Sequence, residues 1–420
     1  MTPGRLRSSA ARVWAVGFYR NSVLILATQA VTSAVGYLFW ALSARDAGPA
    51  ATGLGGSLLS AVSATHLVTS TGIVVGTLRL LAEATDARVR RAEAVRAGVA
   101  TALLSVVGGL LLTTVVPRLV QSLAPAAEPS LAIALVVSVV ATSTGLALDA
   151  VALAVGRTPI MLVRGAVMST GRLLVFLLPG QTSLHDLIWS YALATVAADL
   201  LALALLRPRE SLRHVPRALP EVWDRRRYFL GYHLTALGGA GAVYLLPVVV
   251  LTQLGPVQAG YFYPTWLLGG LFFTISPAVA NAYLARSAAP GEPLHAQVRQ
   301  AVVLIGALLS LPLLVVAVAP DLVLGALGPG YADRGRVLLW VLAVSALPDA
   351  VTNIAVAALR IRRRLAAAAT LNASMSALTL LSAFPLLGLL GIPGAGVAWL
   401  VAQTAGALAV PLLLRRRARV

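Results

Sequence analysis

Apolar segments of about 20 residues recur along the whole chain, and each is long enough to cross a ~30 Å hydrocarbon core as a helix. Of the 420 residues, 58% are hydrophobic and only 11% are charged, and the mean hydropathy is +0.85. The first apolar segment is not followed by a cleavage site typical of signal peptides, so we expect it to be retained. The sequence therefore predicts an all-α polytopic membrane protein.

The hydropathy pattern predicts twelve transmembrane helices. Their expected bounds are 22–44, 54–78, 97–117, 131–155, 159–179, 184–206, 229–252, 258–283, 298–319, 337–359, 366–388 and 393–414. The longest polar segment follows the sixth of them. We therefore predict an N-terminal six-helix lobe (1–206), a basic cytoplasmic linker (207–227) and a C-terminal six-helix lobe (228–420).

The arginine residues predict how the chain is oriented in the membrane. All 33 basic residues are arginine, which together with abundant alanine, glycine and proline is typical of a GC-rich bacterial genome. On the predicted topology 28 of them lie on the side that holds both termini, 4 lie on the opposite side, and Arg172 lies deep within a span. Loops rich in arginine stay in the cytoplasm. We expect a multi-pass protein of the bacterial plasma membrane with both termini cytoplasmic, whose loop arginines contact anionic lipids and not nucleic acid.

Two short motifs recur in the second half of the chain. Gly-Pro-x-x-x-Gly occurs at residues 48–53 and 255–260, at an offset of 207. "LDAV" at 148–151 and "PDAV" at 348–351 are offset by 200. Both halves start on the same side, so the repeat is expected to be parallel, with its axis along the membrane normal. On this pattern Asp149 and Asp349 should occupy matching positions.

Three further motifs follow in order. They are "YFYPTWLLGGLF" at 261–272, "LGALGPGYADRGRVLLWVLAVSALPD" at 324–349 and "LLGIPGAGVAWL" at 389–400. With the two Gly-Pro turns they extend over the whole chain, which resembles the polysaccharide flippases of the multidrug/oligosaccharidyl-lipid/polysaccharide (MOP) exporter superfamily. One departure is the Gly-rich seventh span, which lacks an acidic residue that many relatives carry near its middle.

This resemblance implies a MATE-like V of two six-helix lobes around a central cavity that opens alternately to the two sides of the membrane. The implied substrate is a lipid-linked oligosaccharide, a polyprenyl-diphosphate-linked precursor of a cell-surface polysaccharide. Glycosyltransferases or a polymerase of the same pathway are the protein partners that such a role would bring.

Charged residues within predicted spans are the first candidates for a substrate site, because they normally face the interior of a bundle. Arg172 and Arg164 lie about 80° apart on one helix, so they can share a face, and a pair of guanidinium groups suits a diphosphate. Two interpretations of Arg172 stay open. It lines the cavity and binds substrate, or it is neutralised by Asp149 of the preceding span.

Other polar residues within the spans complete the candidate set. Ser63, His66 and Ser70 form a stripe that either faces the cavity or satisfies the imidazole locally. Asn281 and Ser276 flank Pro277 in the eighth span and are candidates to line the cavity of the second lobe, with Asn281 in the substrate-binding set. Asp349, together with Asp149, is a candidate for ion coupling or for an ion pair, whereas Asp199 is expected to cap a helix end or pair with a loop. The aromatic clusters Tyr228, Tyr232 and His233, and Tyr261, Tyr263 and Trp266, are expected in the interfacial belts.

The sequence contains no nucleotide-binding or metalloprotease motif, no cysteine, and only five histidines, which lack ligand spacing. We therefore expect a transporter and not an enzyme, with no cofactor and no metal. Two alternatives stay open. A MATE-like cation/drug antiporter would need an acidic cavity. An integral-membrane glycan polymerase or ligase would need a larger outer loop than residues 320–336 provide.

Overall fold

The computed structural model describes residues 31–83, 87–206, 226–286, 294–362 and 364–415. A helix over residues 31–46 comes first. The helices that follow are α2 (Gly48–Glu83), α3 (Ala87–Thr114), α4 (Val116–Leu119), η1 (Gln121–Ala127), α5 (Pro129–Ala154), α6 (Pro159–Arg172), η2 (Leu173–Leu177), α7 (Leu184–Leu206), α9 (Arg226–Arg286), α10 (Leu294–Val318), α11 (Pro320–Gly325), α12 (Tyr331–Ile361), α13 (Leu365–Leu390) and α14 (Ile392–Arg415).

Nine helices among the described residues are long and apolar enough to cross a membrane, which makes the chain a multi-pass membrane protein. The predicted count of twelve is matched only roughly. One of the nine, Ala236–Ala280, covers predicted spans 7 and 8, because α9 continues through a kink at Gly255. The helix over 31–46 covers the described part of predicted span 1, and α2 covers predicted span 2; neither helix is among the nine.

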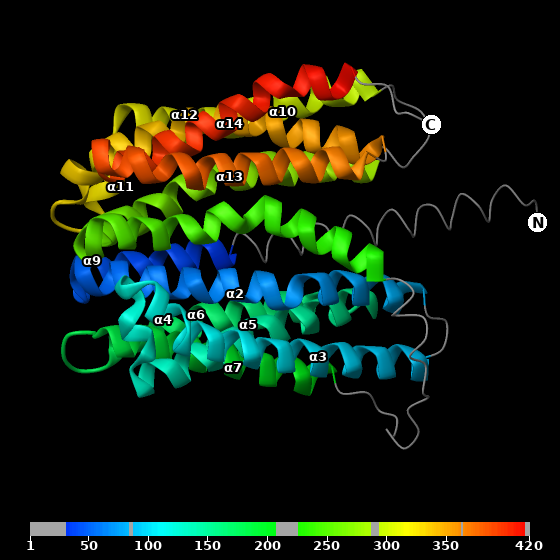
Figure 1. Cartoon of the computed structure of the whole chain (residues 1–420), viewed down its shortest axis with the longest axis horizontal. Helices are drawn as coiled ribbons and strands as arrows, with labels where there is room; N and C mark the ends of the chain where they lie inside the picture. Colours follow the sequence, from blue (N-terminus) through cyan, green and yellow to red (C-terminus); the bar gives the residue numbers. More distant parts are fainter. Residues whose placement is uncertain (1–30, 84–86, 207–225, 287–293, 363, 416–420) are drawn as a thin grey trace, which may run out of the picture.

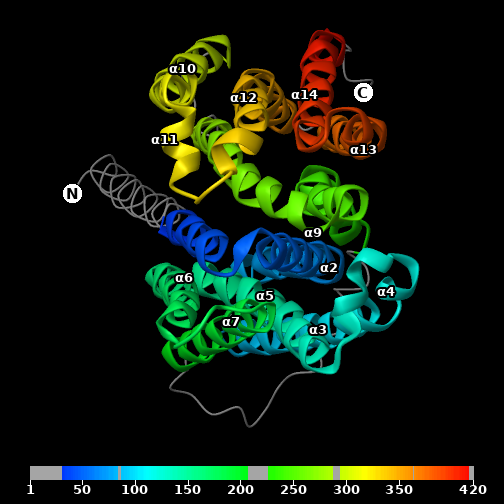
Figure 2. The same cartoon turned by 90° about the vertical axis from the view of Figure 1, so that its left-hand side faces the viewer.

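The long helices run side by side along one direction (Figure 1). In Figure 2, α3, α5, α6 and α7 gather with α2 on one side, and α10, α12, α13 and α14 gather on the other side of α9. The predicted linker falls largely on residues 207–225, which lie outside the described residues, so the lobe boundaries stay a prediction. Many leucines on the outside of this bundle are exposed, among them Leu103, Leu311 and Leu408, and such side chains face lipid in a membrane protein.

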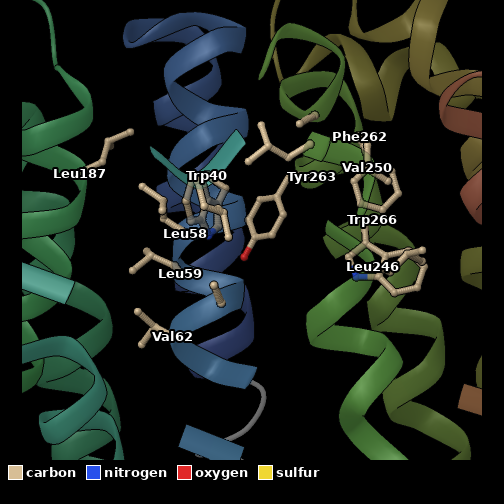
Figure 3. Packing of buried hydrophobic residues seen from close by; sticks show 14 of the residues in the cluster. Trp40, Leu58, Leu59, Val62, Leu187, Leu246, Val250, Phe262, Tyr263 and Trp266 are labelled. Atoms are coloured by element: carbon tan, nitrogen blue, oxygen red, sulfur yellow. The ribbon is translucent and has the colours of Figure 1, made fainter. Parts of the chain in front are cut away.

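The largest buried cluster lies where α2 meets α9. Figure 3 shows Tyr263 of α9 beside Trp40, with Leu246 of α9 on its other side, and all three residues belong to that cluster. The core that joins the two sides is therefore apolar and is formed by the helices that follow the two Gly-Pro turns.

Backbone geometry supports the parallel repeat. Gly48 and Gly255 have φ values of 77° and 79°, which glycine adopts without steric cost. The guanidinium of Arg157 donates to the carbonyl of Leu205 at 3.0 Å, and Arg364 donates to Leu413 at 2.5 Å. In both halves an arginine after the fourth span thus satisfies the free carbonyls at the end of the sixth.

The same offset corrects one expectation. α5 ends at Ala154 and α12 ends at Ile361, 207 residues later. On that offset Asp349 matches Thr142, so the expected equivalence of Asp149 and Asp349 is wrong by seven residues, about two helical turns. The repeated "DAV" therefore does not mark equivalent positions in the two halves, whereas the repeated Gly-Pro motif marks equivalent turns.

Candidate functional site

Arg164 of α6 is the centre of a buried ionic triad. Its Nε and Nη2 donate to the two carboxylate oxygens of Asp149 on α5, at 2.8 and 2.5 Å, and its Nη1 donates to Asp199 on α7 at 3.2 Å. The three side chains are only 9–16% exposed. Because each guanidinium nitrogen already has a carboxylate acceptor, Arg164 has little capacity to bind substrate as well.

Small and polar neighbours make room for this triad. The hydroxyl of Thr144 donates to Asp199 at 3.0 Å. A Cβ on Gly145 would overlap Arg164 and would lie 2.7 Å from Asp199 Oδ1, so glycine is needed where the guanidinium crosses α5. Asp199 was expected at a helix end, but it takes part in the triad. Its spacing gave no sign of this, because its partners lie on other helices.

Arg172 lies at the point where α6 ends and the 3₁₀ helix η2 begins. Its guanidinium carbon lies 4.0 Å from the centroid of the Tyr191 ring, a cation–π contact. Its Nε is buried without a hydrogen-bond partner, and no carboxylate pairs with it in the part of the chain that the structure describes. The suggested Arg172–Asp149 pair is therefore wrong, since Asp149 pairs with Arg164.

The surroundings of Arg172 place it beside the junction of the two halves. Its electrostatic neighbours include Tyr191 of α7 and Tyr263 of α9. The hydroxyl of Tyr191 lies 3.3 Å from Thr142 Oγ1. Arg172 therefore has phenolic groups from both halves among its neighbours, and its Nε is an unused donor. Tyr191 was missed because a single tyrosine in an apolar helix carries no pattern.

The serine–histidine stripe of α2 is bonded within the N-terminal half. His66 Nδ1 lies 2.7 Å from Ser70 Oγ and 3.1 Å from Ser143 Oγ of α5. Ser63 donates to its own helix at the carbonyl of Leu59. Serine hydroxyls thus provide the hydrogen-bond partners of the imidazole, as the second of the two interpretations expected. A role of His66 in transport stays a prediction.

Asp349 of α12 forms a second buried polar group. It is 5% exposed and accepts a hydrogen bond of 2.6 Å from Ser276 of α9. Asn353, one turn further along α12, donates to Ser276 Oγ at 3.2 Å and to the carbonyl of Asp349 at 3.0 Å. Among the described side chains no arginine pairs with Asp349, so the ion-pair interpretation has no support here. Asn281 lies in α9, but its side chain is outside the described ones.

The expected aromatic belt is wrong for two residues. Tyr263 and Trp266 are 8% and 4% exposed and lie in the core between the two halves. Trp266 packs edge to face against Trp399 at 5.3 Å, and Tyr263 packs the same way against Trp40 at 4.7 Å. Tyr261 is half-buried beneath Arg334. The side chains of Tyr228 and Tyr232 lie outside the described ones, and His233 contacts Gly72 of α2.

Several solved structures share this fold. An inward closed conformation of the lipid II flippase MurJ matches with a TM-score of 0.75 over 94% of this chain and 87% of that chain, at 9% identity. An inward-facing multidrug resistance MATE family transporter of the MOP superfamily matches with a TM-score of 0.66 over 92% of this chain and 96% of that chain, at 16% identity. An outward-facing one matches with a TM-score of 0.60 over 95% of this chain and 96% of that chain, also at 16% identity. No protein-family model and no curated protein matches the sequence. The resemblance to MOP exporters is therefore confirmed for the fold.

Proposed function

We propose that this chain is a flippase that moves an anionic lipid-linked oligosaccharide from the cytoplasmic to the outer leaflet of a bacterial plasma membrane. The observation that carries the proposal is the guanidinium of Arg172, which has a buried, unpartnered Nε beside the junction of the two halves. A charge in such a place is costly unless a ligand or water satisfies it. Diphosphate oxygens accept the parallel N–H bonds of a guanidinium, so a polyprenyl diphosphate fits the donor.

The fold supports movement by alternating access. It is shared by a lipid II flippase and by MATE transporters in both inward-facing and outward-facing conformations. In this proposal the diphosphate and sugars pass between the halves while the prenyl chain stays in lipid along the exposed leucines. The protein acts as a transporter without enzymatic chemistry, has both termini in the cytoplasm, and receives its substrate from glycosyltransferases or passes it to a polymerase.

A second candidate function rests on Asp349. This buried carboxylate has no cationic partner among the described side chains, and a MATE-like antiporter for organic cations would need such a group. Under the flippase proposal the same carboxylate couples transport to a proton or another small cation. The two functions differ in the sign of the charge that the protein binds.

Ligand binding separates the two functions. The probe is a polyprenyl diphosphate added to the purified protein in nanodiscs, with the neutral polyprenol and the cation ethidium as competitors. We expect the diphosphate to bind, and Arg172→Gln to weaken it by about tenfold or more, because a hydrogen bond to a charged group is worth roughly 1.5–3 kcal/mol. The matched control is Arg118→Gln, which removes an exposed arginine and should leave affinity unchanged.

Two results would count against the flippase. Equal affinity of Arg172→Gln and the unmodified protein for the diphosphate would remove Arg172 from the binding site. Tighter binding of ethidium, lost in Asp349→Asn, would favour the antiporter.

A further inference from the structure

The two Gly-Pro-x-x-x-Gly motifs pack against each other. A Cβ on Gly53 would overlap the backbone of Pro256 and Gly260, and a Cβ on Gly260 would overlap the backbone of Pro49. Gly53 and Gly260 are equivalent by the 207-residue offset, so the contact is symmetric. The last glycine of each motif packs against the backbone of the other motif. The pseudo-twofold axis of the repeat therefore passes between these two glycines, at the end of the bundle that holds Gly48 and Gly255, hereafter the Gly-Pro end.

At this contact α2 and the second part of α9 approach through their backbones. Ser57 of α2 donates to the carbonyl of Pro247, in the first part of α9, at 3.1 Å. The buried Tyr331 of α12 donates to the carbonyl of Gly260 at 3.0 Å, a bond that lies within the C-terminal half. No ion pair is recorded between α2 and α9 in the described segments. Close packing of small residues stabilises helix contacts in lipid through van der Waals attraction, and few polar bonds would have to break for the helices to separate.

An aromatic layer lies directly beneath the glycine contact. Gly56 and Tyr263 are also equivalent by the same offset, and a Cβ on Gly56 would lie 2.5 Å from Cγ of Tyr263. The large residue on one helix thus fills the space left by the small residue on the other. Figure 3 shows Tyr263 between the two helices, beside Trp40. Tyr263 is also an electrostatic neighbour of Arg172, so this layer lies close to the candidate site.

We propose that the paired Gly-Pro-x-x-x-Gly motifs are a gate. Backbone contact of Gly53 with Gly260, and the insertion of Tyr263 over Gly56, close the Gly-Pro end, and these contacts must part for substrate to leave there. The proposal rests on the proposed transport function. A side chain at either glycine prevents closure, because the atoms it would meet are backbone atoms that cannot turn aside.

Cross-linking tests the contact without depending on the substrate, and transport by the cross-linked protein tests whether the contact must open. The chain has no cysteine, so Gly56→Cys/Tyr263→Cys is the sole pair in the protein. A Cβ at position 56 would lie 2.5 Å from Cγ of Tyr263, and that Cγ is one C–C bond of about 1.5 Å from its own Cβ. The two cysteine Cβ atoms are therefore at most about 4.0 Å apart, within the range of a disulfide. We expect an oxidant to cross-link the pair almost completely, transport to fall by more than about tenfold, and reductant to restore it.

Substitution of the glycines supplies the second measurement. In the same cysteine pair, Gly53→Leu or Gly260→Ala should lower the yield of cross-link several-fold. The matched control is Gly306→Leu on α10, where a Cβ meets nothing within 4 Å. The yield of cross-link is expressed relative to the amount of monodisperse protein. If Gly53→Leu does not fold, the milder Gly53→Ala takes its place.

The outcomes separate the gate from the proposed function. A pair that does not cross-link, or a cross-linked protein that transports at the full rate, contradicts the gate. Cross-linking that depends on Gly53 and Gly260, and that blocks uptake of ethidium in a protein that moves no lipid-linked glycan, supports the gate and contradicts the proposed substrate.

Discussion

Arg164→Ala is expected to remove most of the folded protein from the membrane. The substitution leaves two buried carboxylates, Asp149 and Asp199, without the guanidinium that neutralises them. Breaking a buried pair in this way costs roughly 3–5 kcal/mol, a large part of the stability of a typical domain. The measurement is the amount of monodisperse protein recovered from membranes and its Tm in detergent, with Arg118→Ala as the control for loss of an exposed arginine.

Neutralising the carboxylates should partly rescue the loss. Asp149→Asn/Asp199→Asn in the Arg164→Ala background removes the uncompensated charges, so the triple variant is expected to be more abundant than Arg164→Ala alone. If the Arg164→Ala variant were as stable as the unmodified protein, the triad would contribute nothing to the fold, and the assignment of Arg164 to structure would be wrong.

Arg172→Ala is expected to have the opposite effect, with folded protein retained and transport reduced. Its guanidinium has no carboxylate partner among the described residues, so removing it leaves no charge behind and should not reduce the amount of folded protein. Transport should fall by about tenfold to a hundredfold, because the diphosphate loses its charge-assisted hydrogen bonds. Arg172→Lys should be intermediate, since an ammonium keeps the charge but loses the parallel pair of donors.

The two arginines therefore provide matched controls for each other. They lie eight residues apart on one helix and have the same chemistry, but only Arg164 has acidic partners among the described residues. Loss of folded protein in Arg172→Ala, or full transport normalised to folded protein, would contradict a role for Arg172 in binding substrate.

The sequence was sufficient for the features that depend on local chemistry. Segment length and apolarity predicted most of the membrane helices, and the repeated Gly-Pro motif located the turns at Gly48 and Gly255. Both are local consequences of residue type, because lipid requires long apolar helices and a positive φ favours glycine.

The partners of the charged residues could not be predicted in the same way. Arg164 and Arg172 lie on one broad face of a helix, so periodicity could not decide which of them meets Asp149. The choice depends on how α5, α6 and α7 pack, and on the change from α-helix to 3₁₀ helix after Arg172. The aromatic residues Tyr263 and Trp266 were misplaced for a related reason, since aromatic side chains near a helix end suit an interface and a buried crossing equally well.

Movement of an anionic lipid-linked glycan from one leaflet to the other is the activity that we propose for this protein. The most direct measurement uses proteoliposomes that contain a fluorescent polyprenyl-diphosphate-linked sugar, with an impermeant reagent that destroys the fluorophore in the outer leaflet. We predict that fluorescence in vesicles with the protein falls beyond the outer-leaflet fraction. With Arg172→Ala, or with no protein, the loss should stop at that fraction. If the loss of fluorescence is no greater with the protein than without it, the flippase is contradicted. Uptake of ethidium by the same vesicles under a proton gradient would then favour a cation antiporter.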